Sequence, residues 1–414
     1  MNPSVFPPAS PGAPSRVTRT GGRATSGRLL QLAVAAVAVV AGPWASGCAI
    51  ENFGVPHPTD SLRYPVSVTA DPSGDVVWVT SGNFDLSYRG GAVLGMDLNT
   101  HQWLPGAAVE LGGYPGPMAM LEQGGEGVRG YSLSREDDAL FQVLIDRTGA
   151  TPTLDCPGSV TLSNGILTCP ADEAISTATG LGPGEVEDAE LTLGADPYGV
   201  HIHKTRRPAT GEPDLLISTA MVDGTIGVFR LDTDGTPTLI QTLDLAGGAY
   251  AIAESPVTGR MYVSSKTDAL IRVLRVDPPD AEAVVAANAA GEPFPNPVVR
   301  HVSDIPIPTA ASSDQSRALA VSTDGSRLYI AYRSPDSLVV VDTGEGAVSG
   351  VPRNGVLQKI PVGRSPADVV VVPARPGAPE RVYVSCYNDQ RVDVVDPASG
   401  TVVDRITTGR GPFG

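Results

Sequence analysis

The chain has 414 residues, of which 41% are hydrophobic and 18% are charged, which is enough for a large core or two domains and excludes a disordered protein. Its 47 glycines, 38 prolines and short valine-rich apolar runs favour an all-β fold over a helical one. The net charge is −16, and because the first 47 residues hold four arginines and no acid, the rest carries 25 bases against 45 acids, or −20. Such a surface repels phosphate backbones, so we expect no nucleic-acid partner, and we interpret the basic run 204–207 as a solvated loop.

The N-terminal segment is typical of an export signal. Residues 1–28 are polar and basic, residues 29–45 are apolar, and small residues follow. The apolar run is short for a membrane span and is interrupted by Gln31 and Pro43, so a permanent membrane helix is the alternative interpretation.

Cys48 follows Ala45, Ser46 and Gly47, and this stretch resembles the lipobox of bacterial lipoproteins. The resemblance implies cleavage before Cys48 and acylation of its thiol and its new amine, which together would anchor the protein stably to a membrane. Ala49 stands where that family carries the aspartate of inner-membrane retention, so the resemblance implies the outer membrane, with the protein facing the periplasm or the cell surface. The alternative is ordinary cleavage nearby, with Cys48 unmodified. We therefore divide the chain into a signal peptide (1–47), a tether (48–63) and a folded domain (64–414).

The folded domain repeats one pattern. Its clearest copy, residues 365–409, holds a strand after a Gly-x-x-Pro turn, a second strand with an aromatic residue, a third that ends in Asp, and a fourth. Four short strands per unit indicate a β-propeller blade, in which stacking around an axis buries both faces of each sheet. Six units are readable, with second-strand markers at Trp78, Tyr131, Leu216, Tyr262, Tyr329 and Tyr383.

The run "GRGPFG" at 409–414 matches the opening of a further blade, so we expect an all-β propeller that is seven-bladed when complete. The alternative is a closed ring of six blades with a short tail. Two units carry long insertions, 148–188 in the second, before a fourth strand expected at 189–194, and 278–297 in the fourth. Such insertions lie on one rim and either form binding edges or are tolerated surface loops.

The repeats resemble the YVTN-type β-propeller repeat. The stretches "STDGSRLYIAY" with "LVVVD", and "RVYVSCYND" with "VDVVDPASGTVV", match its consensus closely. The resemblance implies the fold, but it says little about function because propellers of this type host binding and several chemistries.

Two of the four cysteines are predicted to pair. Cys156 and Cys169 bracket a hairpin that turns near Asn164, and an exported protein folds in an oxidising compartment. The bond would stabilise that loop by roughly 3 kcal/mol in the chain-entropy model. The alternative is two unpaired thiols. Cys386 is interpreted as a small core residue.

Candidate ligand contacts lie near the mouth of the predicted central channel. His201 and His203 alternate along an innermost strand and therefore face the same side. They could supply two imidazoles to a metal, but nothing in the sequence fixes a third ligand, so we predict no metal and no cofactor. Together with Asp71 and Asp368 they are the candidate contacts, and a satisfied structural pair is the alternative for the histidines. No catalytic residue is predicted.

From these features we expect a lipid-anchored binding module rather than an enzyme, with the membrane and a protein, glycan or envelope component as partners. The alternative rests on resemblance to lactonase-like and quinoprotein-like propellers, which implies a hydrolase or a dehydrogenase with its site at the channel mouth.

Overall fold

Six β-sheets make up most of the chain in the computed structural model, which describes residues 54–123, 127–149, 151–162, 164–176, 194–207, 211–308, 316–344, 354–409 and 411–412. The first two sheets contain β1 (Tyr64–Ala70), β2 (Val76–Gly82), β3 (Ala92–Asp97) and β4 (Trp103–Glu110), then β5 (Pro115–Gln123), β6 (Gly127–Ser134), β7 (Ala139–Asp146) and β11 (Ile175–Ser176). The third and fourth contain β12 (Pro197–His203), β13 (Leu215–Ala220), β14 (Thr225–Leu231) and β15 (Pro237–Asp244), then β16 (Ala249–Glu254), β17 (Met261–Ser265), β18 (Leu270–Asp277) and β19 (Val298–Pro306). The fifth and sixth contain β20 (Ser316–Val321), β21 (Arg327–Arg333), β22 (Asp336–Asp342) and β23 (Gly355–Pro361), then β24 (Pro366–Val372), β25 (Arg381–Cys386), β26 (Arg391–Asp396) and β27 (Thr401–Thr407).

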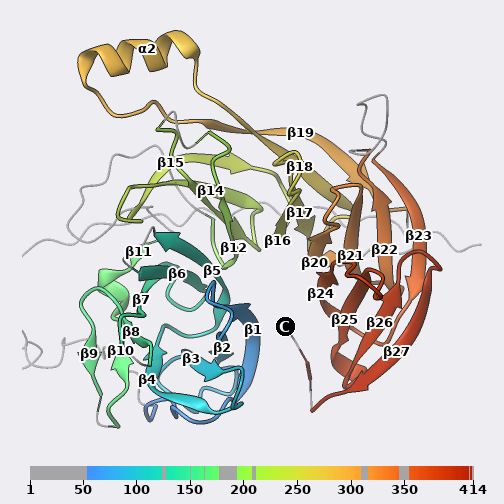
Figure 1. Ribbon diagram of the computed structural model, residues 1–414, viewed down its shortest axis with the longest axis horizontal. Coiled ribbons are helices and arrows are strands. Elements are labelled where there is room, and N and C mark those ends of the chain that lie inside the picture. Colours follow the sequence, from blue (N-terminus) through green and yellow to red (C-terminus); the bar gives the residue numbers. More distant parts are fainter. Residues whose placement is uncertain are drawn as a thin grey trace, which may run out of the picture. The chain divides into compact units, whose positions relative to one another are not determined.

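The first strand of each sheet is the innermost one. These strands pack on one another in chain order, β1 on β5, then β12, β16, β20 and β24, around a common centre (Figure 1). The expected all-β propeller of four-stranded blades is thereby confirmed. Among the described strands, β24 and β1 do not share this packing, and the seventh blade stays a prediction.

The middle strands of the second to fifth sheets are apolar on both faces because each of these sheets lies between two others. Five consecutive residues in the centre of β21 and of β22 are buried. The aromatic markers of the second strands lie in these interfaces. Trp78, Tyr131, Tyr262 and Tyr329 are all fully buried. The Tyr131 hydroxyl donates to the carbonyl of Gly235 in the third sheet, which ties two successive sheets together.

The long insertion in the second unit extends the first sheet. It contains β8 (Thr153–Asp155), β9 (Val160–Thr161), β10 (Leu167–Thr168) and the short helix η1 (Ala171–Glu173). β10 pairs in parallel with β4, while β8 and β11 pair with β7. A disulfide joins Cys156 and Cys169, whose Cα atoms are 5.8 Å apart. Of the fourth strand expected at 189–194, only Gly194 lies within the described residues.

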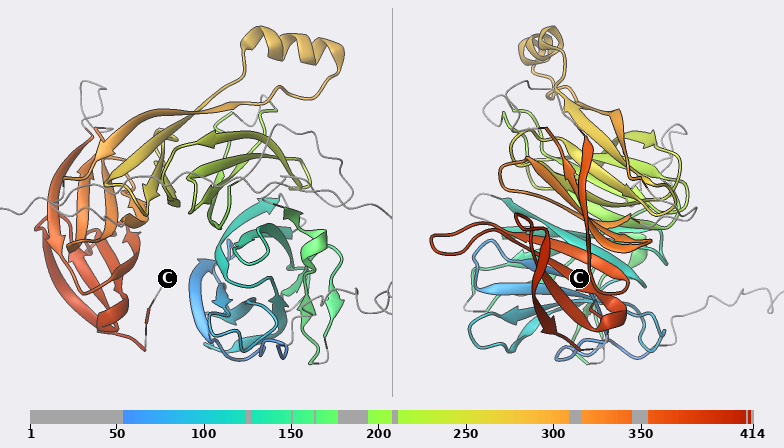
Figure 2. Two further views of the ribbon diagram at one scale, coloured as in Figure 1. Left: turned by 180° about the vertical axis from the view of Figure 1, so that it is seen from behind. Right: turned by 90° about the vertical axis from the view of Figure 1, so that its right-hand side faces the viewer.

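The insertion in the fourth unit contains helix α2 (Ala281–Ala290), which stands away from the sheets (Figure 2). Asp280 caps its N-terminus by accepting hydrogen bonds from the backbone N–H groups of Glu282 and Ala283. No helix among the described residues is long and apolar enough to cross a membrane.

Residues 54–63, expected to belong to a tether, lie against the first sheet. His57 is fully buried, and its backbone N–H donates to Glu110 at the end of β4. Its ring lies 3.1 Å from the Ser81 hydroxyl, and Asn164 of the insertion donates to its carbonyl oxygen. Residues 54–63 and the insertion in the second unit therefore both contact the first sheet near the end of β4.

Candidate functional site at the channel mouth

Every innermost strand carries an irregularity near its start. The pairing register shifts after Pro65, Pro115, Pro197, Ala249, Ser316 and Pro366. A β-bulge of this kind re-aims side chains and occurs often beside active sites. The six strands begin at the same end of the propeller, and we call this end the channel mouth. The bulges place Tyr198, Tyr250 and Arg317 at equivalent positions of three successive sheets.

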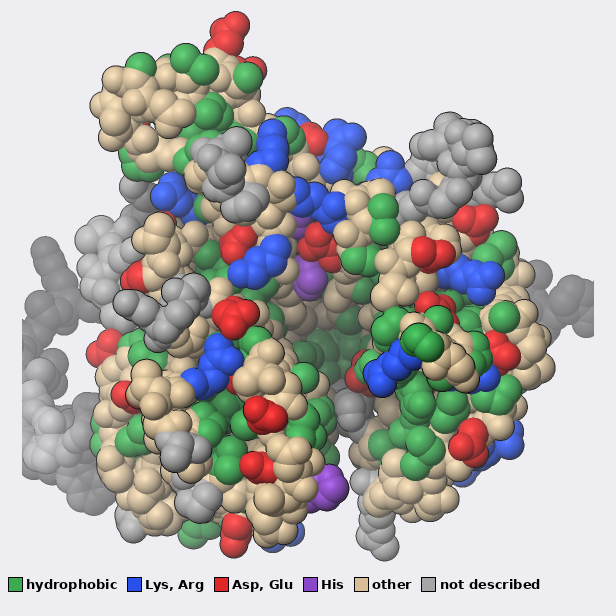
Figure 3. Space-filling model, in the orientation of Figure 1, with side chains coloured by type: hydrophobic (Ala, Val, Ile, Leu, Met, Phe, Trp, Pro, Cys, Tyr) green, Lys and Arg blue, Asp and Glu red, His purple; other side chains and the backbone are tan. Residues whose placement is uncertain are grey.

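The bulges enclose a cavity of about 230 Å³ that all six innermost strands line. Its walls are formed by Val66, Ser67, Val68, Thr69, Pro117, Tyr198, Gly199, Val200, Tyr250, Ala251, Ile252, Ala318, Leu319, Ala367 and Asp368. Figure 3 shows the molecule hollowed between the sheets, with hydrophobic side chains prominent in the hollow. A central cavity with apolar walls and a few polar groups is the usual form of a small-molecule site.

Two stacked tyrosines form one wall of this cavity. The rings of Tyr198 and Tyr250 have centroids 4.4 Å apart, and the guanidinium of Arg317 lies 5.0 Å from the Tyr250 centroid. Burial, followed by the interaction with Tyr250, raises the pKa of Tyr198 well above its ordinary value. Its hydroxyl therefore stays protonated at neutral pH and can act as a hydrogen-bond donor.

Asp368 is the acid of the cavity. One of its oxygens accepts the backbone N–H of Val369, and within the described part of the chain no charged partner faces the carboxylate. Its side chain touches the cavity although the carboxylate lies deep in the protein, and this burial raises its pKa to about 6. A carboxylate with such a pKa is suited to general acid–base work near neutral pH.

Basic side chains surround the tyrosine pair at the same mouth. The guanidinium of Arg333, at the end of β21, donates to the carbonyl of Pro366 at 3.0 Å. Lys266 follows β17, and its backbone N–H donates to Gly248, the residue before β16. Arg135 forms an ion pair with Asp196 just before β12.

The predicted histidine pair lies at the other end of β12. His201 and His203 lie about 10 and 17 Å along β12 from Tyr198, and neither lines the cavity. His201 Nε2 lies 2.9 Å and His203 Nδ1 lies 3.0 Å from the same Glu254 oxygen, although the second contact does not have hydrogen-bond geometry. Burial raises the pKa of Glu254, but the interactions with His201 and His203 together outweigh it, so the pKa is lowered. Glu254 and the nearby Arg206, with a guanidinium nitrogen 3.8 Å from the carboxylate, were not among the residues that sequence reasoning selected.

The other predicted residues are dispersed. Asp71 is buried behind β1, where it accepts hydrogen bonds from the Trp78 indole and the Arg147 guanidinium, both at 2.9 Å. This satisfied pair of bonds is structural. Cys48 lies outside the described residues. Within the described ranges, no group of three or more His, Cys, Asp or Glu residues is arranged to hold a metal ion. Of the four candidate ligand contacts, the structure brings only Asp368 into the cavity.

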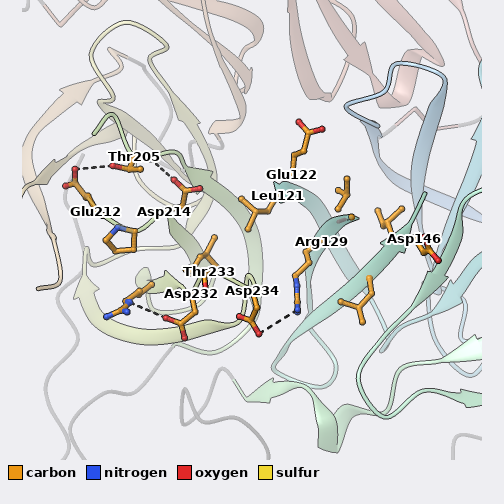
Figure 4. A pocket seen from close by; sticks show the side chains of 18 residues that line it. Leu121, Glu122, Arg129, Asp146, Thr205, Glu212, Asp214, Asp232, Thr233 and Asp234 are labelled. Carbon is orange, nitrogen blue, oxygen red and sulfur yellow. Dashed lines mark hydrogen bonds and ion pairs between the residues drawn. The ribbon is translucent and has the colours of Figure 1, made fainter. Parts of the chain in front are cut away.

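A larger cavity, of about 1140 Å³, lies between the second and third sheets (Figure 4). Its acidic side chains are already engaged: Glu212 and Asp214 accept hydrogen bonds from Thr205, and Asp234 lies 3.9 Å from Arg129. Gly127 and Gly211 on its wall adjoin residues that the structure does not describe. We assign it no function.

Comparison with known proteins shows the fold. No protein-family model matches the chain, and no curated protein matches it. A candidate 6-phosphogluconolactonase from Bacteroides uniformis is 17% identical, with a TM-score of 0.55, over 85% of this chain and 88% of that one. A periplasmic gluconolactonase from Pseudomonas aeruginosa is 17% identical, with a TM-score of 0.53, over 84% and 87% of the two chains. A protein from Lactobacillus plantarum is 18% identical, with a TM-score of 0.54, over 87% and 88%.

The comparison also corrects one expectation. The chain was expected to be a binding module rather than an enzyme, and this preference is wrong, because two of these similar structures are named as lactonases. The expectation failed because only His, Asp, Glu and Arg at aligned strand positions were sought, and the tyrosines and Arg317 sit in bulges that such an alignment does not show.

Proposed function

We propose that the protein is a hydrolase that opens a small lactone in the cavity at the channel mouth. The observation that carries this proposal is the half-buried Asp368, whose pKa of about 6 suits a general base, in a cavity beside the protonated hydroxyl of Tyr198. The names of structures with the same fold support it. They supply the class of reaction, and the residues in the cavity supply the chemistry.

In this proposal Asp368 removes a proton from a water molecule, and the oxygen of that water bonds to the carbonyl carbon of the lactone. Negative charge then develops on the carbonyl oxygen, where the hydroxyl of Tyr198 can stabilise it. The ring C–O bond breaks as the carbonyl re-forms, and protonated Asp368 returns its proton to the leaving oxygen. One lactone and one water give one hydroxy acid, and Asp368 is regenerated.

The cellular location of the protein is also a proposal. The basic segment, the apolar run and the small residues before Cys48 support export and lipid attachment, and the YVTN-type repeat is supported by the residues quoted above. A protein or glycan partner at the rim stays a prediction. Labelling of cells with a radioactive fatty acid tests the anchor. The label should enter the protein and disappear in Cys48→Ser, whereas a label that persists in the variant would contradict lipidation at this residue.

The activity is tested with δ-gluconolactone and its phosphorylated counterpart, after subtraction of spontaneous hydrolysis. Asp368→Asn should reduce kcat/KM by about a hundredfold or more, which is the usual contribution of a general base. The rate of the unmodified protein should rise with pH and level off above about 6, because only the ionised carboxylate accepts the proton.

Asp404→Asn is a matched control. Asp404 is exposed on β27 of the same sheet, and its oxygen also accepts the N–H of the next residue, so this variant should keep full activity. Failure to open either lactone, or an undiminished rate in Asp368→Asn, would refute the proposed function.

A further inference from the structure

Three basic side chains converge on the channel mouth from two successive sheets. Lys266 is held beside the start of β16, Arg317 is the second residue of β20, and Arg333 reaches the start of β24. A carbonyl oxygen, that of Pro366, orients the Arg333 guanidinium, and the Arg317 guanidinium lies over the Tyr250 ring.

Among the described residues, Lys266 and Arg333 interact with carboxylates only at longer range, with Asp196 and Asp336 respectively. In the part of the chain that the structure describes, neither one forms an ion pair with a carboxylate. Asp368 does not serve this role, because its own pKa is raised by burial with no cation offsetting it. Asp336, near Arg333, accepts the backbone N–H of Ser365.

The cations repel one another. Burial, followed by the charges of Arg317 and Arg135, lowers the pKa of Lys266, and burial followed by Arg317 lowers the pKa of Arg333. A bound anion would relieve this repulsion. This cluster of basic side chains is also unusual for a chain whose net charge is −16. A cationic mouth in an acidic protein concentrates anionic ligands.

We propose that Lys266, Arg317 and Arg333 form an anion subsite, so that the substrate carries a phosphate ester or a carboxylate in addition to its lactone ring. The statement about a substrate rests on the proposed function. The subsite itself is a binding property and can be tested separately. Guanidinium groups pair with carboxylates and phosphates through two parallel hydrogen bonds, and an ammonium adds a point charge. The subsite would orient the ring toward Asp368, which lines the cavity on the wall of which Tyr250, the ring beneath Arg317, also lies.

Calorimetric titration with three unreactive sugars tests the subsite. Glucose 6-phosphate carries a phosphate ester, gluconate carries a carboxylate, and glucose carries no charge. We expect one of the two anions to bind at least tenfold more tightly than glucose, and the stronger one identifies the anionic group. Lys266→Met should weaken that anion about tenfold or more, which is typical for loss of a charge-assisted contact, and Lys266→Arg should restore part of it.

Lys204→Met is the matched control, because it removes the same charge from the far end of β12, where Lys204 pairs with Asp214. It should leave all three affinities unchanged. Arg333→Met is the second test of the subsite, and circular dichroism checks that each variant folds. Equal binding of the three sugars, or equal weakening by Lys204→Met and Lys266→Met, would overturn the proposal. If anions bind in a Lys266-dependent way but no lactone is opened, the proposed function fails and the anion subsite stands.

Discussion

At the scale of single residues, Asp368 carries a stability cost that a structural role does not explain. A carboxylate deep in the protein without a cationic partner disfavours its own ionised form, which is the form present at neutral pH. Asp71 shows the contrasting case, because the Trp78 indole and Arg147 satisfy its carboxylate, and its pKa is lowered despite burial. An acid with a raised pKa that lines a cavity is the pattern expected where a residue contributes to chemistry at the expense of stability.

We therefore predict that Asp368→Asn stabilises the protein while it removes activity. The native pKa of about 6 lies above the ordinary value of 3.8, so the native state holds this proton more tightly, and stability falls as pH rises through that window. The variant should melt at a higher temperature than the unmodified protein at pH 8 and at nearly the same temperature at pH 4. Scanning calorimetry at both pH values measures this, with Asp404→Asn as the control. A lower melting temperature for Asp368→Asn at pH 8 would show that the carboxylate is structural.

At the scale of elements, the bulges that open the innermost strands shape the site. They require close approach of neighbouring backbones, which glycine allows. A Cβ atom on Gly116 would lie 2.4 Å from the carbonyl oxygen of Tyr198, and one on Gly199 would lie 2.3 Å from that of Tyr250. In the sequence Gly116 lies between two prolines and Gly199 lies two residues after one, but these residues do not mark the bulge itself. For this reason the sequence analysis named Asp368 as a candidate contact but did not name Tyr198, Tyr250 or Arg317.

Gly199→Ala should destabilise the protein by about 2–4 kcal/mol, because the new methyl group would meet fixed backbone of the next strand rather than a side chain that can move. It should also abolish hydrolysis by displacing Tyr250. Gly409→Ala is the control, since nothing lies within 4 Å of the added carbon, and it should change stability by less than about 0.5 kcal/mol. Urea denaturation monitored by fluorescence measures both, and equal stabilities would refute the close approach.

The disulfide links the insertion to the first two sheets more closely than the sequence indicates. From the sequence, the bond fixes only an inserted hairpin. In the structure, Cys156 and Cys169 are 4% and 5% exposed and pack in the same apolar cluster as Trp78 and Phe141. The N–H of Cys169 also donates to the carbonyl of Glu110 at the end of β4.

Replacement of both cysteines by serine should lower the free energy of unfolding by about 2–4 kcal/mol. Hydrogen exchange should accelerate along β4, β9 and β10, while β22 and β26 keep their protection, because the cluster joins only the first two sheets. Chemical reduction of the unmodified protein should give the same pattern. Faster exchange confined to residues 156–169 would show that the bond serves the hairpin alone.

At the scale of the whole molecule, the repeat made the architecture predictable and left the site largely unpredicted. Strand spacing, the second-strand aromatics and the terminal Asp of the third strand recur, so the sheets and their order could be predicted. The cation group at the mouth could not, because Lys266 follows a second strand, Arg317 lies within a first strand and Arg333 ends another second strand. Their proximity arises only when the sheets are arranged around one centre. The contact between Glu254 and His201 could not be predicted either, because the two residues lie on neighbouring sheets.

The repeated turns lead to a final prediction about acid stability. Each sheet contains an aspartate whose pKa is lowered: Asp97, Asp146, Asp234, Asp277, Asp324 and Asp396. Turn N–H groups are the main cause for the first three, the Arg275 guanidinium for Asp277 and the Ser322 hydroxyl for Asp324, while for Asp396 turn N–H groups outweigh burial. A lowered native pKa contributes stability above the ordinary value of 3.8, and this contribution is lost as pH falls through the native value.

Because every sheet contains such a group, the melting temperature should stay nearly constant from pH 7 to 5 and fall steeply below about pH 4, in one cooperative transition. The raised pKa values of Asp368, Glu110 and Glu136 act in the opposite direction, but they are three groups against these six. Circular dichroism melting at pH 7, 5, 4 and 3 measures the effect, and 1 M NaCl should preserve most of it, since short hydrogen bonds in turns are screened less than distant charges. An unchanged melting temperature at pH 3, or one sheet that melts separately above pH 4, would contradict a stability shared among the six sheets.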